Sequence, residues 1–196
     1  MAGKGRIDAR VAERLDRVIA ARGVATRFVR RTGAREIEVL DLPRLEVECV
    51  VHNLAGPEFA RRYSRREGEA LRRPVEEFYL LAGERPMVTK SHMVAFALAT
   101  PEDVNELIRL AHELNVAALA YLAERSLKLV QAAVNFARDA TGRLTVDSEL
   151  TPETMHLWDP RQDVHYDLAH LPADPDDAAA RYRALAVLLG ADDAVP

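Results

Sequence analysis

The first amphipathic pattern lies in residues 7–19, where apolar side chains recur at steps of three and four. The stripe consists of Ile7, Val11, Leu15, Val18 and Ile19. This spacing places all five side chains on one face of an α-helix, so the segment is predicted to pack a helix against a core. Gly23 follows where we expect the helix to stop, because glycine readily adopts the left-handed backbone of a C-terminal cap.

Short segments in the next part of the chain alternate between apolar and β-branched or polar residues with a period of two. They cover residues 25–30, 36–40 and 45–51. The alternation predicts antiparallel strands joined by turns, with Thr32-Gly33 as the first turn. Gly56-Pro57 breaks the third strand, and a short helix is predicted to begin at residues 59–63.

The central and later segments repeat this strand pattern. Residues 64–73 are charged and are predicted to be a surface connection, and residues 74–81 are predicted to form another strand. Residues 127–136 and 144–150 form a predicted strand pair around the turn Thr141-Gly142-Arg143. The strands therefore extend over most of the chain length.

Two further helices have clear start signals. Thr100-Pro101-Glu102-Asp103 combines a capping threonine, a proline in the first turn and acids near the helix N-terminus, and the helix runs towards Arg125. Asp174-Pro175 begins a final helix that stops near Gly190. The pattern predicts an α+β fold with an antiparallel sheet flanked by helices, in a single domain over residues 1–196.

Composition excludes several classes of protein. The chain has 27 Lys and Arg against 31 Asp and Glu, a net charge of −4, which gives no support for a nucleic-acid partner. No apolar run is long enough for a membrane span, and we expect no membrane partner. The single cysteine, Cys49, rules out an internal disulfide framework. A cytoplasmic location is therefore predicted.

Generic motifs do not reveal a function. The chain has no Walker loop, no glycine-rich dinucleotide fingerprint, no Gly-x-Ser-x-Gly and no His-Glu-x-x-His. Gly3-Lys4-Gly5 can hold a phosphate, but by itself it is more simply a terminal segment. His112 is in the same way more simply a packed or surface histidine than a ligand.

Several longer stretches, taken together, resemble the SAICAR synthetase family, the ATP-dependent ligases of purine synthesis. The stretches are Gly3-Lys4-Gly5, Gly23-Val24-Ala25-Thr26, Glu46-Val47-Glu48-Cys49-Val50-Val51-His52-Asn53, Pro74-Val75-Glu76-Glu77-Phe78-Tyr79, Ser91-His92, and Leu150-Thr151-Pro152-Glu153-Thr154-Met155-His156-Leu157-Trp158-Asp159. The last is similar to the family's Ile-Ser-Pro-Asp-Thr-Cys-Arg-Leu-Trp-Asp. The resemblance extends from residue 3 to about residue 190 and implies the C-terminal portion of that fold.

The chain departs from the family at the positions that hold magnesium and ATP. The family has an N-terminal lobe over the nucleotide phosphates, and we expect it to be absent because only Met1 and Ala2 precede Gly3. The family signature Asp-x-Lys-x-Glu-Phe-Gly corresponds to residues 131–137, where both acids and the lysine are replaced. Ser148 stands in place of an aspartate that helps hold magnesium, although Glu149 remains. Because Mg²⁺ needs carboxylates and phosphates, we expect no ATP-dependent ligation.

The substrate side differs as well. By the same resemblance, His52 and Glu58 replace an arginine and a serine that help bind the ribotide phosphate, and His156 replaces a further substrate-binding arginine. Arg27 stands where the family has a histidine. Loss of an arginine removes a bidentate anion-binding group, so the ligand or its position is predicted to differ.

These replacements define the predicted site. We expect His52 and His156 to act as acid–base groups, since histidine titrates near neutral pH, with Glu58 and Glu149 as carboxylate partners. The expected substrate-binding residues are Lys4, Arg27, Asn53, Gln131, Asn135 and Ser148. Two histidines and a carboxylate can also ligate zinc or iron, but we assign no metal ligands and expect no cofactor.

The first hypothesis is an ATP-independent enzyme acting on a small-molecule purine- or imidazole-type nucleotide. Ring opening, cyclisation or isomerisation in coformycin-type nucleoside antibiotic biosynthesis is the reaction class that we associate with it, by analogy with family members in such gene clusters. The alternatives are a non-catalytic nucleotide-binding or scaffold protein on the same fold, and a residual ATP-dependent ligase. A homo-oligomer is expected, because absence of the lobe would expose sheet surface.

Overall fold

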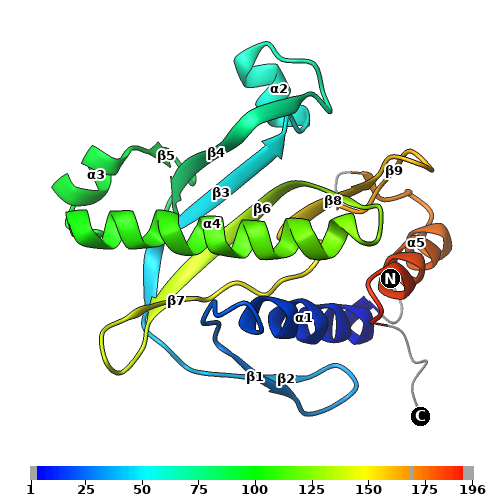
Figure 1. The fold of residues 1–196 in the computed structure, drawn as a ribbon, viewed down its shortest axis with the longest axis horizontal. Helices are drawn as coiled ribbons and strands as arrows, with labels where there is room; N and C mark the ends of the chain where they lie inside the picture. The colour runs from blue at the N-terminus through cyan, green and yellow to red at the C-terminus, as the bar shows by residue number, and fades with distance from the viewer. Residues whose placement is uncertain (1–3, 168–169, 192–196) are drawn as a thin grey trace.

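The computed structural model of the chain describes residues 4–167 and 170–191. Its centre is an antiparallel seven-stranded sheet of order β5-β4-β3-β6-β8-β9, with β7 paired to β6 (Figure 1). The long strands are β3 (Arg44–Leu54), β4 (Ala70–Leu80) and β6 (Lys128–Arg138). The shorter ones are β5 (Met87–Val88), β7 (Leu144–Val146), β8 (Met155–Asp159) and β9 (Val164–His165).

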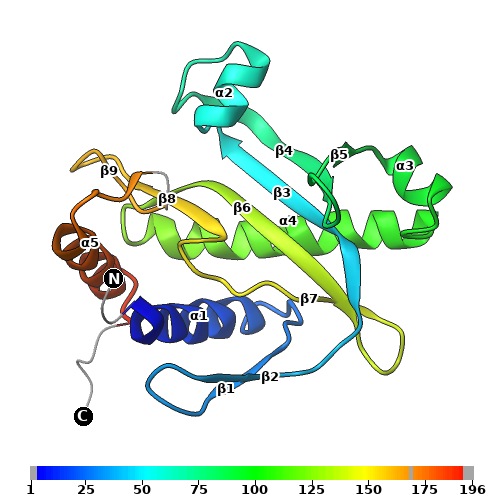
Figure 2. The ribbon, with the colours of Figure 1, turned by 180° about the vertical axis from the view of Figure 1, so that it is seen from behind.

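Helices pack against one face of this sheet. The long helix α4 (Pro101–Ala123) crosses that face, and α1 (Lys4–Ala20) lies beside it against α5 (Pro175–Leu188) (Figure 1). A separate two-stranded ribbon, β1 (Phe28–Arg31) and β2 (Ile37–Val39), lies next to α1. The short helices are α2 (Pro57–Tyr63) and α3 (Lys90–Ala95). In Figure 2, which shows the molecule from behind, α4 lies behind the sheet and does not cover the face turned to the viewer; we call this the open face.

Alternation along the strands separates the core from this open face. On β3, Val47, Cys49 and Val51 are fully buried in the same cluster as Leu107 and Leu114 of α4. The intervening side chains of the strand point to the other face, because successive residues of a strand alternate. The sheet thus has one apolar face under α4 and one face that carries polar groups.

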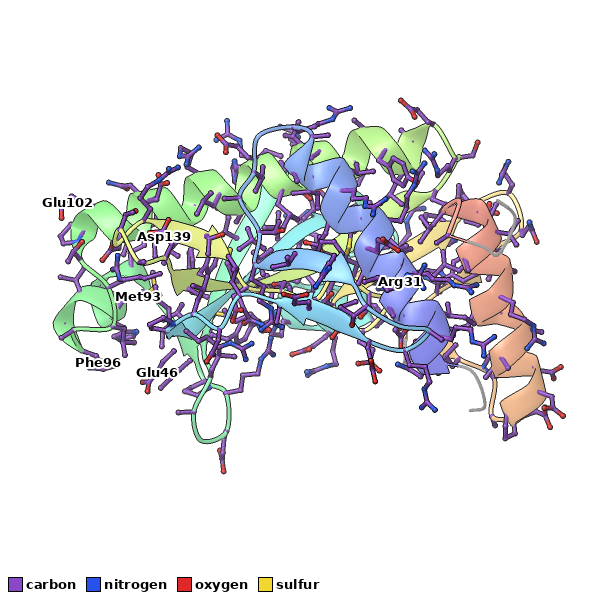
Figure 3. The ribbon with its side chains drawn as sticks, turned by 90° about the horizontal axis from the view of Figure 1, so that it is seen from below. Arg31, Glu46, Met93, Phe96, Glu102 and Asp139 are labelled. Carbon is purple, nitrogen blue, oxygen red and sulfur yellow. The ribbon has the colours of Figure 1, made fainter. Side chains whose placement is uncertain are left out.

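Local signals in the sequence set the helix ends. The Thr100 hydroxyl accepts a hydrogen bond from the Asp103 N–H, the Asp103 carboxylate accepts one from the Thr100 N–H, and Pro101 follows the cap. This is the capping box predicted from the sequence. Gly23, after α1, has a φ of 85°, the left-handed conformation expected of a helix-ending glycine. Figure 3 shows Glu102 near the start of α4, and Phe96 beside the short helix α3.

The α+β class and the antiparallel sheet flanked by helices are confirmed, and three local predictions are corrected. Residues 70–73, predicted to belong to a charged connection, form the start of β4, because Ala70 pairs with Leu54 of β3 and a register irregularity lies between this pair and the pair of His52 with Val75. The predicted strand at 144–150 ends at Val146. The strand pair β8 and β9 is absent from the sequence prediction, since two to five residues are too few for a clear alternation.

Candidate functional site

The open face of the sheet carries a cavity of about 410 Å³, which we call the cleft. Its floor residues belong to β3, β6 and β8. The residues that line it are Glu48, Val50, Pro57, Glu58, Arg85, Gln131, Ala133, Pro152, Glu153, Thr154, His156 and Asp167. Strand residues form the floor, and the remaining lining residues come from the start of α2, from the turn between β4 and β5, and from the segments before β8 and after β9.

Strand register places the floor residues next to one another. Val50 of β3 pairs with Ala133 of β6, and Gln131 of β6 pairs with His156 of β8. On β8 the buried Met155 and Leu157 face the core. His156 lies between them and therefore points to the cleft, by the two-residue period of a strand.

His156 belongs to a group of titratable side chains at one wall of the cleft. The group, which we call the histidine cluster, consists of His156, His165, Asp167 and His170. Nε2 of His156 lies 2.8 Å from Nδ1 of His165 and 2.7 Å from Oδ2 of Asp167. Nδ1 of His170 lies 2.8 Å from the same Asp167 oxygen. Residues from two paired strands and the following segment thus converge on one point.

The electrostatics of this cluster follow from its packing. Burial by itself raises the pKa of Asp167, but hydrogen bonds from His156 and His170 outweigh burial and hold the pKa well below its usual range. Burial lowers the pKa of His165, and the neighbouring His156 and His170 lower it further. The carboxylate is therefore ionised at neutral pH, and His165 is neutral.

The part of the floor that β6 provides is uncharged. Gln131 and Ala133 line the cleft, and Asn135 follows on the same face of β6. Ser148 is buried, and its hydroxyl accepts a hydrogen bond of 2.6 Å from the Asn135 N–H and donates one to the Ala133 carbonyl. The two hydrogen bonds of Ser148 thus join the segment after β7 to the backbone of β6. Its hydroxyl carries no negative charge.

The position of the family signature in this floor agrees with a comparison against known families. The SAICAR synthetase family model matches residues 1–171. The chain belongs to this family.

Relatives and solved structures agree with that assignment. A phosphoribosylaminoimidazole-succinocarboxamide synthase from Pelodictyon phaeoclathratiforme is 33% identical over 161 residues, which cover 81% of this chain and 68% of the relative. The crystal structure of the corresponding synthase from Ehrlichia chaffeensis superposes with a TM-score of 0.92 at 24% identity, covering 100% of this chain and 84% of that one. A SAICAR synthetase in complex with ADP has a TM-score of 0.92 at 22% identity, with coverages of 98% and 83%.

These comparisons support an enzyme family and the predicted fold. The relatives are named as ordinary synthases, so they give no support to an ATP-independent reaction or to a role in nucleoside antibiotic biosynthesis. Loss of the family's ligase activity also stays a prediction.

His52, one of the two predicted acid–base histidines, has different partners from His156. It is 3% exposed, and its Nε2 lies 3.1 Å from Oε2 of Glu77. Its ring packs against Phe59 of α2 with the centroids 4.7 Å apart. Burial by itself raises the pKa of Glu77, but hydrogen bonds from four side chains, His52 among them, lower it to about 2. This geometry links β3 to α2, so a catalytic role for His52 stays a prediction.

Of the predicted carboxylates and lysine, only Glu58 lines the cleft, whereas Glu149 and Lys4 are not among its lining residues. Glu58, in the first turn of α2, lines the cleft and is exposed. Lys4 binds Asp8 at 2.6 Å and the cleft residue Glu153 at 2.5 Å. Burial, Asp8 and Glu153 all raise the pKa of Glu149, while Arg27 and Lys4 lower it less strongly. The contact of Lys4 with the cleft is its ion pair with the lining residue Glu153.

Two predicted substrate ligands are held by other side chains. Arg27 forms an ion pair of 2.9 Å with the buried Asp147, which also pairs with Arg44. Asn53 exchanges two hydrogen bonds, of 2.8 and 2.9 Å, with Asn115 of α4. This pair places the Asn53 amide on the helix side of the sheet, away from the cleft floor. Substrate binding by these two residues stays a prediction.

The structure adds residues that the sequence reasoning did not single out. Glu48 and Arg85 form an ion pair at the cleft, and the Arg85 guanidinium lies 4.3 Å from the ring centroid of Tyr79. His165 and His170 complete the histidine cluster. Glu48 had a detectable signal, since it alternates with the buried Val47 and Cys49, whereas Arg85 lies in a turn without any pattern.

The remaining predictions concern location and partners. None of the helices in the described part of the chain is both long and apolar enough to cross a membrane. The nucleotide ligand stays a prediction. The cytoplasmic location, the homo-oligomer and the single domain over residues 1–196 stay predictions, and Gly3 of the Gly3-Lys4-Gly5 motif lies outside the described residues.

Proposed function

We propose that this member of the SAICAR synthetase family binds a purine- or imidazole-type ribotide in the cleft and acts on it without Mg²⁺ and ATP. The observation that carries the proposal is the uncharged β6 part of the floor, made by Gln131 and Ala133, with the buried Ser148 bonded to the backbone beside them. Proteins hold Mg²⁺ through carboxylates together with substrate phosphates. The amide, methyl and hydroxyl groups of these three residues supply no charge at the positions of the family signature and of the family aspartate.

Phosphoryl transfer depends on that charge. The metal and basic residues neutralise the phosphate oxygens as the transition state forms, and they account for most of the catalysis. The position of a family lysine is Ala133, which offers no ammonium group. Ser148 is also committed to two hydrogen bonds with the backbone of β6, so it is a poor metal ligand.

The cleft does contain groups that recognise a ribotide. Arg85 provides a guanidinium for the phosphate if it exchanges its partner Glu48 for the ligand. Glu58 and Glu153 also line the cleft and supply acceptors for ribose hydroxyls. A guanidinium and two carboxylates therefore line the same cavity. A ribotide needs both, because its phosphate is anionic and its ribose hydroxyls donate hydrogen bonds.

His156 and Asp167 supply acid–base chemistry. The 2.7 Å contact between the imidazole and the carboxylate orients the ring towards its partner. His156 is 8% exposed and lines the cleft, so it can exchange a proton with a bound base or ring carbon. Ring opening, cyclisation or isomerisation of the ribotide needs such a group and no nucleotide cofactor.

Calorimetric titration tests the binding part of this proposal. Inosine 5′-monophosphate and an imidazole ribotide are each titrated into the full chain, and Mg²⁺ with ATP is titrated separately. We expect a ribotide to bind and ATP to give no heat. Arg85→Ala is expected to weaken the ribotide, whereas Arg22→Ala, an exposed change outside the cleft, is the matched control.

The ordinary ligase is the second candidate, and the family relatives and the retained Glu149 favour it. Two results would establish the ligase and refute our proposal. One is tight binding of Mg²⁺ and ATP, and the other is release of ADP from Mg²⁺ and ATP when aspartate and an imidazole ribotide carboxylate are added. Binding of neither ligand would favour the scaffold alternative.

A further inference from the structure

We propose that the histidine cluster binds one divalent transition-metal ion, with Zn²⁺ as the first candidate. The proposal goes beyond the proposed function and shares two side chains with it, because His156 and Asp167 would hold the ion instead of acting as an acid–base pair when the metal is bound. The ion is held by protein side chains alone and is not the magnesium that accompanies ATP, so zinc binding and ribotide binding are measured separately.

The chemistry of the donors favours such an ion. The cluster offers three imidazole nitrogens and one carboxylate oxygen. Imidazole is a preferred ligand of zinc, iron, nickel and copper, whereas magnesium and calcium prefer oxygen donors. Zinc in proteins is commonly bound by four side-chain donors in a tetrahedral arrangement, with histidine nitrogens and carboxylate oxygens among its usual ligands.

The distances suit a single ion. One donor atom from each of the four residues lies within 4.8 Å of the others. Three of the donor pairs are 2.7 to 2.8 Å apart. Donors around a tetrahedral zinc ion, at about 2.0 Å from the metal, are about 3.3 Å apart. Small rotations of the side chains therefore open the cluster enough for an ion.

The rings are also held from outside. Trp158 of β8 stacks on His165 with an interplanar angle of 9°, and His165 stacks on His170 at 24°. Arg181 of α5 donates a hydrogen bond of 2.8 Å to the His170 carbonyl. Because β8 and β9 are paired at Trp158 and His165, strand register fixes the first two histidines. Such outer contacts orient ligands in metal sites.

The site faces the cleft. His156 and Asp167 both line the cavity, so an ion bound between them has one side turned towards a cleft ligand. The alternative is that a protonated histidine simply forms an ion pair with Asp167. The two explanations differ at a pH where imidazoles are neutral, because metal binding persists there and the ion pair weakens.

The experiment measures zinc binding by the full chain. The protein is stripped with a chelator, and ZnCl₂ is titrated by calorimetry at pH 7.5, with metal content checked by mass spectrometry. We expect one Zn²⁺ per chain and a rise in the thermal unfolding temperature on zinc addition. Co²⁺ is expected to give the visible absorption of a tetrahedral site.

Variants locate the site. His165→Ala and His170→Ala are each expected to weaken zinc binding by more than about 100-fold, the upper end of losses seen for outer-shell partners. His112→Gln, which changes a histidine on α4 outside the cluster, is the control and is expected to bind like the parent. Circular dichroism checks that each variant is folded. Absence of stoichiometric zinc in the parent, or equal binding by the parent and the His165 and His170 variants, would overturn the proposal.

Discussion

The hydroxyl of Ser148 accepts a hydrogen bond of 2.6 Å from the backbone N–H of Asn135. The same hydroxyl donates to the Ala133 carbonyl, so one buried side chain joins two residues of β6. The family resemblance places a magnesium-binding aspartate at this position, and a carboxylate there would compete for the same space. The serine therefore replaces a charged ligand by a structural connection.

Ser148→Ala is expected to lower the free energy of unfolding by about 1–2 kcal/mol, because it leaves a buried N–H without its acceptor. Denaturant unfolding measures the change. Thr32→Ala, which removes an exposed hydroxyl from the ribbon turn, is the control and should have little effect. Equal stabilities of the two variants would contradict a structural role for the Ser148 hydroxyl.

Asp16 predicts a loss of stability on raising the pH. Burial raises its pKa from 3.8 to about 7, against the weaker opposing effects of Thr26 and Arg27. Between these two values the unfolded chain releases the proton and the folded chain keeps it, so folding stability falls as the pH rises from about 4 to 7. Asp16→Asn should remove this fall and become the more stable form above pH 7, by up to about 4 kcal/mol. Thermal melts of both proteins across this range measure the difference, and parallel pH profiles would refute the assignment.

Glu77 predicts the opposite dependence at acid pH. Its pKa is 4.5 in an unperturbed chain and about 2 in the fold. Its ionised form therefore contributes stability that is fully present above about pH 4.5 and is lost as the pH falls to about 2. The shift from 4.5 to about 2 corresponds to about 3 kcal/mol. Glu77→Gln should be less stable than the parent at pH 7 and should show a smaller loss below pH 4.5. A constant stability gap between the two proteins from pH 7 to pH 2 would show that this carboxylate is not responsible.

The Asn53–Asn115 pair predicts a coupled effect between β3 and α4. Asn115 is 1% exposed, so removing its partner leaves a buried amide without hydrogen bonds. Asn53→Ala and Asn115→Ala should each cost about 1–3 kcal/mol, and the double variant should cost less than their sum. A double-mutant cycle of unfolding free energies measures this coupling. Weaker ribotide binding by Asn53→Ala at unchanged stability would instead support its predicted substrate role.

Much of the fold could be predicted from local patterns. The capping residues at Thr100 mark a helix start whatever surrounds them, and the alternation of residues 45–51 marks a strand with one buried face. The short strands β8 and β9 could not be predicted, because they owe their strand form to pairing with distant parts of the chain. For the same reason the sequence pattern predicts a connection at residues 70–73. The strand there depends on the pairing of Ala70 with Leu54 of β3.

The sequence by itself determined which helices and long strands form and which residue types replace the family's charged positions. Helix periodicity, caps and strand alternation depend on residues close together in the sequence, so a single sequence is enough to predict them. Tertiary structure alone decided which polar groups meet. In the folded chain His52 contacts Glu77, Asn53 forms hydrogen bonds with Asn115, and Arg27 forms an ion pair with Asp147. Folding also brings His165 and His170 next to His156. The reason is physical: a side chain's charge and reactivity depend on partners that strand register and packing bring together, and those partners are far away along the chain.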